Sequence, residues 1–78
     1  MKKKIYEIIK ELRFEKHYSQ QFVADYLGID RSNYSKYELG KLEISAEMLK
    51  NICLLYSVSA DYILGLKEIW YVYRKSYI

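Results

Sequence analysis

The sequence predicts an all-α domain of five helices with a short aromatic C-terminal extension. Apolar residues recur at i, i+3, i+4 and i+7 spacing, which places them on one face of a helix. The chain has no proline, and its 3 glycines stand at positions 28, 40 and 65, where the apolar patterns stop. We therefore expect one domain over residues 1–66 and an extension over residues 67–78.

The first predicted helix covers residues 3–16, and Arg13 lies beside its apolar stripe. The stripe consists of Ile5, Ile8, Ile9 and Leu12. The second helix is expected over residues 20–27, after Ser19, a residue type that caps free backbone N–H groups. Gly28 then supplies a left-handed turn, which is least costly without a Cβ atom. The inner face of this second helix is expected to consist of Val23, Ala24 and Leu27.

The third helix is expected over residues 31–39, between a capping Asp30 and Gly40. Its inward residues are predicted to be Tyr34, Tyr37 and Glu38. The fourth helix is expected over residues 46–56 after Ser45, and the fifth over residues 59–64 before Gly65. The apolar face of the fourth helix is predicted to contain Leu49, Ile52, Cys53 and Tyr56.

The C-terminal extension admits two interpretations. Its aromatic and β-branched residues are Ile69, Trp70, Tyr71, Val72 and Tyr73. Their propensity favours a strand, while a continuation of the helical domain is equally compatible with the pattern. They either cover the core or pair with a second subunit, because aromatic residues are enriched in the cores of interfaces.

Composition excludes several classes of protein. No apolar run approaches the roughly 20 residues that span a bilayer, and charges interrupt the segment after the N-terminal lysines, so we expect neither a membrane protein nor a signal peptide. A single cysteine, Cys53, forms no internal disulfide and is expected to be a small buried hydrophobe. With His17 the only histidine, a Cys/His zinc cluster is not available, and we expect no metal or other cofactor.

The outward face of the third predicted helix is the strongest functional signal. Arg31, in its first turn, can present a forked donor to guanine, and Lys36 can reach another base or the backbone. Ser32 and Asn33 can donate or accept hydrogen bonds. The net charge of +3 permits nucleic-acid binding without being diagnostic. The alternative for this face is an ordinary solvated surface.

Several short motifs occur in a specific order and spacing over residues 9–66. They are LR in the first helix, SQ opening the second, AxxLGI into the turn, RSNYSKYExGK over the third, and VSADYILGL at the close. In this order they resemble the lambda-repressor-like, Cro-repressor type of helix-turn-helix domain, the xenobiotic-response-element (XRE) family. The chain departs from the family pattern at Phe22, where a polar residue is usual, and at Tyr34, where a smaller branched residue is common.

The resemblance implies a sequence-specific regulator that binds double-stranded DNA. Base-reading residues would be Arg31, Ser32, Asn33 and Lys36, with Asn33 at the margin of the groove. Phosphate contacts would come from Ser19, Gln20, Gln21, Tyr37 and Lys41. Arg13 and Glu38 match a family salt bridge between the first and third helices. We expect a cytoplasmic repressor of bacterial or phage type, acting as a homodimer on a palindromic operator.

The sequence leaves two other classes of function open. A protein-interaction module, such as the antitoxin of a toxin–antitoxin pair, is the alternative that an exposed patch of Phe22 and Tyr26 would favour. An enzyme is the weaker alternative, because the sequence shows no nucleophile with its base, and Glu7, Glu11 and Glu15 have the spacing of a solvated helix face.

Overall fold

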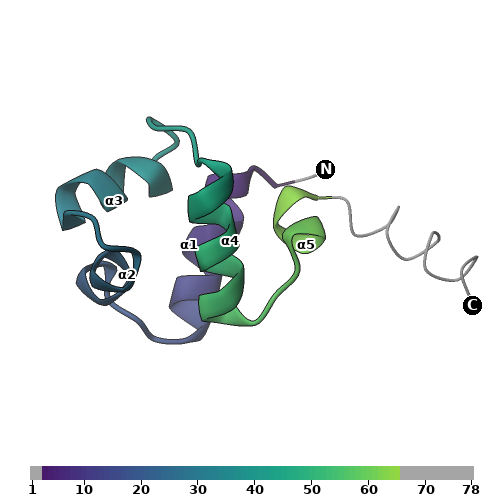
Figure 1. Ribbon diagram of the computed structural model, residues 1–78, viewed down its shortest axis with the longest axis horizontal. Coiled ribbons are helices and arrows are strands. Elements are labelled where there is room, and N and C mark those ends of the chain that lie inside the picture. The colour runs from purple at the N-terminus through teal and green to yellow at the C-terminus, as the bar shows by residue number, and fades with distance from the viewer. Residues whose placement is uncertain (1–2, 66–78) are drawn as a thin grey trace, which may run out of the picture.

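A computed structural model describes residues 3–65, and over that range the chain is all-α. Its helices are α1 (Ile5–Glu15), α2 (Gln20–Leu27), α3 (Arg31–Glu38), α4 (Ala46–Tyr56) and α5 (Ala60–Leu64). Figure 1 shows α2 and α3 at one end of the domain and α5 at the other, with α1 and α4 between them. The five-helix prediction is confirmed. The residues expected at a dimer interface, Ile69 to Tyr73, lie outside the described residues.

Serine hydroxyls cap three of the helices, as predicted for Ser19 and Ser45. The Oγ atoms of Ser19, Ser45 and Ser59 each accept a hydrogen bond from the backbone N–H three residues later, at 3.0, 3.1 and 3.1 Å. Each bond satisfies one N–H group that has no partner inside its helix. The helix starts are therefore encoded locally.

The cap expected at Asp30 is wrong in one respect. Asp30 is the N-cap residue of α3, but its carboxylate makes no capping hydrogen bond within residues 3–65. Its backbone carbonyl accepts the Tyr34 N–H at 2.9 Å, which starts the helix, while the exposed carboxylate remains in solvent. Extended backbone at Asp30 is thus sufficient to begin α3.

Two predicted helices are longer than the observed ones at their N-terminal ends. Residues 3–16 were expected, whereas α1 is Ile5–Glu15, because Lys4 has extended backbone dihedrals and donates its N–H to the Glu7 carboxylate at 2.8 Å. Similarly, Ser59 is the cap of α5 rather than its first residue. At the other end of α3, Leu39 is the C-cap, one residue beyond the last helical residue.

A short turn joins α2 to α3. Gly28 ends α2 in the left-handed region at φ 74°, and its N–H donates to the Asp25 carbonyl at 3.1 Å. The Ile29 N–H donates to the Ala24 carbonyl at 3.0 Å, which satisfies another carbonyl at the helix end. This geometry directs the chain into α3 after only three residues.

The core lies between the helices and contains most of the predicted apolar residues. The buried apolar residues are Ile8, Ile9, Leu12, Val23, Ala24, Tyr34, Met48, Ile52, Tyr56 and Ile63. Leu27, Tyr37, Leu49 and Cys53 were expected inside and are half-buried against this core. Met48 was missed, although its spacing to Ile52 and Tyr56 places it on the same face of α4. No helix within residues 3–65 is long and apolar enough to cross a membrane.

Candidate nucleic-acid interface

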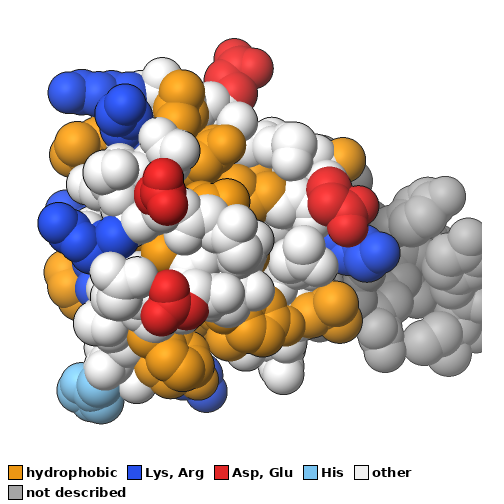
Figure 2. Space-filling view, turned by 60° about the vertical axis from the view of Figure 1, so that its left-hand side comes forward, with side chains coloured by type: hydrophobic (Ala, Val, Ile, Leu, Met, Phe, Trp, Pro, Cys, Tyr) orange, Lys and Arg blue, Asp and Glu red, His pale blue; other side chains and the backbone are white. Residues whose placement is uncertain are grey.

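The α3 helix has a polar outer face and a buried inner face. Arg31, Ser32, Asn33 and Lys36 are all exposed, whereas Tyr34 is fully buried and Glu38 is 5% exposed. Figure 2 shows Lys and Arg side chains along the left edge of the face that includes α2 and α3, with acidic side chains farther inward. The four residues expected to read bases are therefore presented to solvent by one helix.

A buried ion pair attaches α3 to α1. The Arg13 guanidinium donates from Nε to Glu38 Oε2 at 2.6 Å and from Nη2 to Oε1 at 3.0 Å. The side chains of Arg13 and Glu38 are only 9% and 2% exposed. Arg13 Nη1 also donates to the Tyr18 carbonyl at 3.0 Å, so the guanidinium contacts the loop before α2 as well. The expected salt bridge is present and sets the orientation of α3.

The protonation states of this cluster follow from its hydrogen bonds. Burial by itself raises the pKa of Glu38, but donors from Arg13, Tyr34 and Gln20 outweigh it and hold the pKa below its usual value. The hydrogen bond to Glu38 raises the pKa of Arg13, and burial followed by the same carboxylate raises the pKa of Tyr34. Glu38 is thus an anion and Tyr34 a neutral donor at neutral pH.

Gln20 joins the buried ion pair to the exposed face of α3. Its Nε2 donates to Glu38 Oε1 at 3.1 Å, and its Oε1 accepts a hydrogen bond from Arg31 Nη1 at 3.3 Å. The sequence predicted Gln20 only as a phosphate contact. No local pattern could have revealed this bridge, because its residues belong to α2 and α3 and meet only when the two helices pack.

The remaining phosphate candidates lie at the start of α2, near the end of α3 and in the loop after α3. Ser19 is exposed, although its hydroxyl serves as the α2 cap, and the Gln21 amide donates to Asp25 Oδ1 at 2.8 Å. Lys41 is exposed in the loop after α3, whereas Tyr37 is half-buried.

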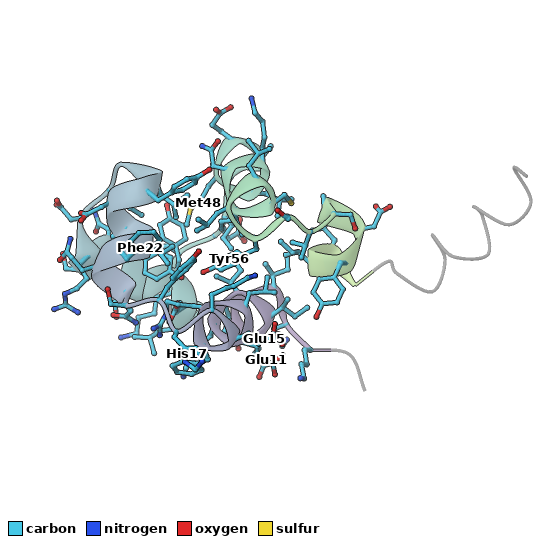
Figure 3. All side chains as sticks on the ribbon, turned by 90° about the horizontal axis from the view of Figure 1, so that it is seen from below. Glu11, Glu15, His17, Phe22, Met48 and Tyr56 are labelled. Carbon is cyan, nitrogen blue, oxygen red and sulfur yellow. The ribbon has the colours of Figure 1, made fainter. Side chains whose placement is uncertain are left out.

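The side chains that could serve catalysis or metal binding lie apart from one another. Glu7, Glu11 and Glu15 are exposed, and Figure 3 shows Glu11 and Glu15 on the outer side of α1. His17 is exposed just beyond the end of α1, and burial raises the pKa of the half-buried Cys53 thiol. Within residues 3–65, no group of three or more His, Cys, Asp or Glu residues is arranged to hold a metal ion.

Comparison with known proteins agrees with this geometry. A family model described as helix-turn-helix matches residues 9–63, which include the two helices of the candidate interface. The chain belongs to the XRE-type helix-turn-helix family. This membership confirms the family resemblance inferred from the sequence motifs.

Relatives in Bacillus subtilis strain 168 are helix-turn-helix proteins by name. The SPbeta prophage-derived uncharacterized HTH-type transcriptional regulator YonR is 45% identical over 58 residues, which are 74% of this chain and 54% of that protein. The HTH-type transcriptional regulator AnsR is 40% identical over 57 residues, 73% of this chain and 49% of that protein. The chain therefore spans about half the length of the curated relatives it matches.

A solved structure has the same fold. The crystal structure of the P22 c2 repressor protein in complex with a synthetic operator matches with a TM-score of 0.75. The match covers 83% of this chain and 98% of that chain at 22% sequence identity. The lambda-repressor-like fold is thereby confirmed for this chain.

Proposed function

We propose that this chain is a sequence-specific DNA-binding transcriptional regulator that reads the major groove with the outer face of α3. The observation that carries the proposal is the exposure of Arg31, Ser32, Asn33 and Lys36 on a helix held in place by a buried ion pair. A helix of this kind fits the major groove, where arginine can bind guanine O6 and N7 together. Ser19, Gln20, Gln21, Tyr37 and Lys41 would set the register through phosphate contacts.

The regulator is proposed to act as a homodimer that represses transcription by covering a palindromic operator in the cytoplasm. A single helix of 8 residues reaches few base pairs, so one domain discriminates weakly between sequences. Two domains reading half-sites one helical turn apart, about 34 Å, multiply that discrimination. The residues Ile69 to Tyr73 of the extension are the candidate dimerisation element.

Selection of bound duplexes from a random DNA pool tests this proposal. A palindrome is expected, and Arg31→Ala is expected to relax selectivity at one base position and weaken operator binding by about 1–3 kcal/mol. Lys50→Ala is the matched control, because it removes one exposed positive charge from α4, outside the candidate interface. Unchanged operator affinity and selectivity in Arg31→Ala would refute the assignment of α3.

A protein-interaction module is the second candidate function, and exposed aromatic residues favour it. Phe22 is 47% exposed and Tyr26 is 48% exposed, one helical turn apart on α2. Salt dependence separates the two candidate functions. The logarithm of DNA affinity falls linearly with the logarithm of salt concentration, with a slope of about −0.9 per neutralised phosphate. Binding to a protein partner with no such slope, together with no selected DNA sequence, would favour the interaction module.

A further inference from the structure

The Glu38 carboxylate accepts two hydrogen bonds on each oxygen. Oε1 accepts from Arg13 Nη2 and Gln20 Nε2, and Oε2 accepts from Arg13 Nε and from the Tyr34 hydroxyl at 2.5 Å. Four donors occupy the sites that a carboxylate offers, so its orientation is well determined. Tyr34 contributes the only one of these donors that belongs to the same helix as Glu38.

The orientation of the Gln20 amide follows from Glu38. A carboxylate accepts hydrogen bonds and cannot donate them, so it selects the NH2 end of the amide. The carbonyl end of Gln20 is then directed at Arg31, whose guanidinium is donor-only. With the amide reversed, an NH2 group would face the guanidinium and the hydrogen bond to Arg31 would be lost. The buried Glu38 carboxylate therefore fixes the position of Gln20 Oε1, the acceptor for the exposed Arg31 guanidinium.

We propose that Tyr34 and Glu38 are positioning residues for Arg31, acting through the amide of Gln20. Tyr34 lies at 0% exposure and cannot touch DNA, so any effect it has on base selection must pass through its neighbours. Its hydroxyl holds Oε2 of Glu38, which keeps Oε1 aligned with Gln20 and keeps the Arg31 side chain in one orientation before DNA is met. This inference rests on the proposed function, in which Arg31 reads a base.

Loss of the Tyr34 hydroxyl is expected to loosen this alignment without emptying the core. Tyr34→Phe keeps the ring in place and leaves a buried carboxylate oxygen short of one donor. The donors able to compensate are the side chains of Arg13 and Gln20, and a shift of Gln20 toward Oε2 moves its carbonyl away from Arg31. Arg31 then samples more orientations, and its preference for one base pair weakens.

The test measures binding of the full chain to its selected operator and to operators with each base pair substituted. Tyr34→Phe is expected to lower discrimination at the base pair read by Arg31 by roughly 2- to 30-fold, the range for residues coupled to a site they do not touch. Discrimination at the other positions is expected to stay unchanged. If Tyr34 has a purely structural role, Tyr34→Phe will lower the melting temperature or weaken binding to all operators equally. Base discrimination will then stay at the wild-type level, and that result would overturn the proposal.

Tyr56→Phe is the matched control. Tyr56 is also a buried tyrosine, at 4% exposure, and Figure 3 shows it in the interior between the helices. Its hydroxyl has no hydrogen-bond partner within residues 3–65, so its removal breaks no hydrogen bond. Wild-type discrimination is expected in this variant. Equal losses in Tyr34→Phe and Tyr56→Phe would refute a route through Glu38.

A second variant keeps the proposal testable if Tyr34→Phe does not fold. Gln20→Met breaks the bridge at a half-buried position and leaves the Arg13–Glu38 pair intact, so it is expected to reduce the same discrimination. In this background Tyr34→Phe should add no further loss at that base pair. If Arg31→Ala leaves discrimination unchanged, the proposed function fails. If Arg31→Ala abolishes it while Gln20→Met and Tyr34→Phe retain it, only the positioning role fails.

Discussion

Replacement of Glu38 by alanine tests how strongly the buried ion pair supports the domain. The substitution removes the acceptor for Arg13, Tyr34 and Gln20 and leaves the Arg13 guanidinium, 9% exposed in its side chain, without its carboxylate. Breaking a buried pair by removing one partner costs about 3–5 kcal/mol. The total free energy of unfolding of a domain of about 60 residues is about 3–9 kcal/mol. Glu38→Ala is therefore expected to lose much or all of its folded population.

Urea denaturation at pH 7, followed by far-ultraviolet circular dichroism, measures this loss. The matched control is Glu11→Ala, which breaks the ion pair between Lys3 and Glu11 at the surface, where both side chains are about half exposed. Exposed pairs contribute little because water and salt screen them, so the control is expected to keep the wild-type midpoint. Similar small shifts in Glu38→Ala and Glu11→Ala would refute the assignment of a stabilising buried pair.

A compensating variant separates an unpaired charge from simple loss of packing. Arg13→Met with Glu38→Leu and Tyr34→Phe replaces the charged cluster by apolar groups of similar size. Apolar replacement of a whole buried ion pair is often neutral or stabilising, so this triple variant is expected to recover most of the stability that Glu38→Ala loses. Stability as low as that of Glu38→Ala would show that shape, rather than the unpaired guanidinium, accounts for the loss.

Two further predictions concern acid and a glycine. Because folding lowers the pKa of Glu38, the ionised carboxylate stabilises the folded state above the ordinary pKa of 4.5, and this stabilisation is lost as the pH falls through the folded pKa. The urea midpoints of wild type and Glu38→Gln should therefore converge as the pH is lowered from 7 to 3. A constant difference between the two midpoints over this pH range would contradict the prediction. Gly40→Ala should lower the melting temperature more than Gly28→Ala. Both glycines have a positive φ, 78° at Gly40 and 74° at Gly28, at which alanine costs about 1–3 kcal/mol of stability. Only at Gly40 would the new Cβ also meet a side chain, at 2.7 Å from Tyr6 Cε2. Equal melting temperatures for the two variants would show that the Tyr6 ring moves freely.

Local signals were sufficient to predict the helices because helix boundaries depend on neighbouring residues. Ser19 and Ser45 each accept a hydrogen bond from a backbone N–H three residues later, so these caps depend on no distant part of the chain. Gly28 ends α2 for an equally local reason, its positive φ. The exposed face of α3 was also predictable, since helical periodicity places the buried Tyr34 opposite Ser32 and Lys36.

Only the tertiary structure decided how that face is supported. The sequence placed Gln20 at the start of a helix, and the family resemblance paired Arg13 with Glu38, but neither indicated that Gln20 links Glu38 to Arg31. The Tyr34 hydroxyl donates to Glu38 one turn later in the same helix, whereas the other donors to that carboxylate come from α1 and α2 and meet it only when the helices pack. The physical reason is range: caps and turns are satisfied within a few residues, whereas a buried charge recruits every donor that folding brings within hydrogen-bond distance, wherever that donor lies in the chain.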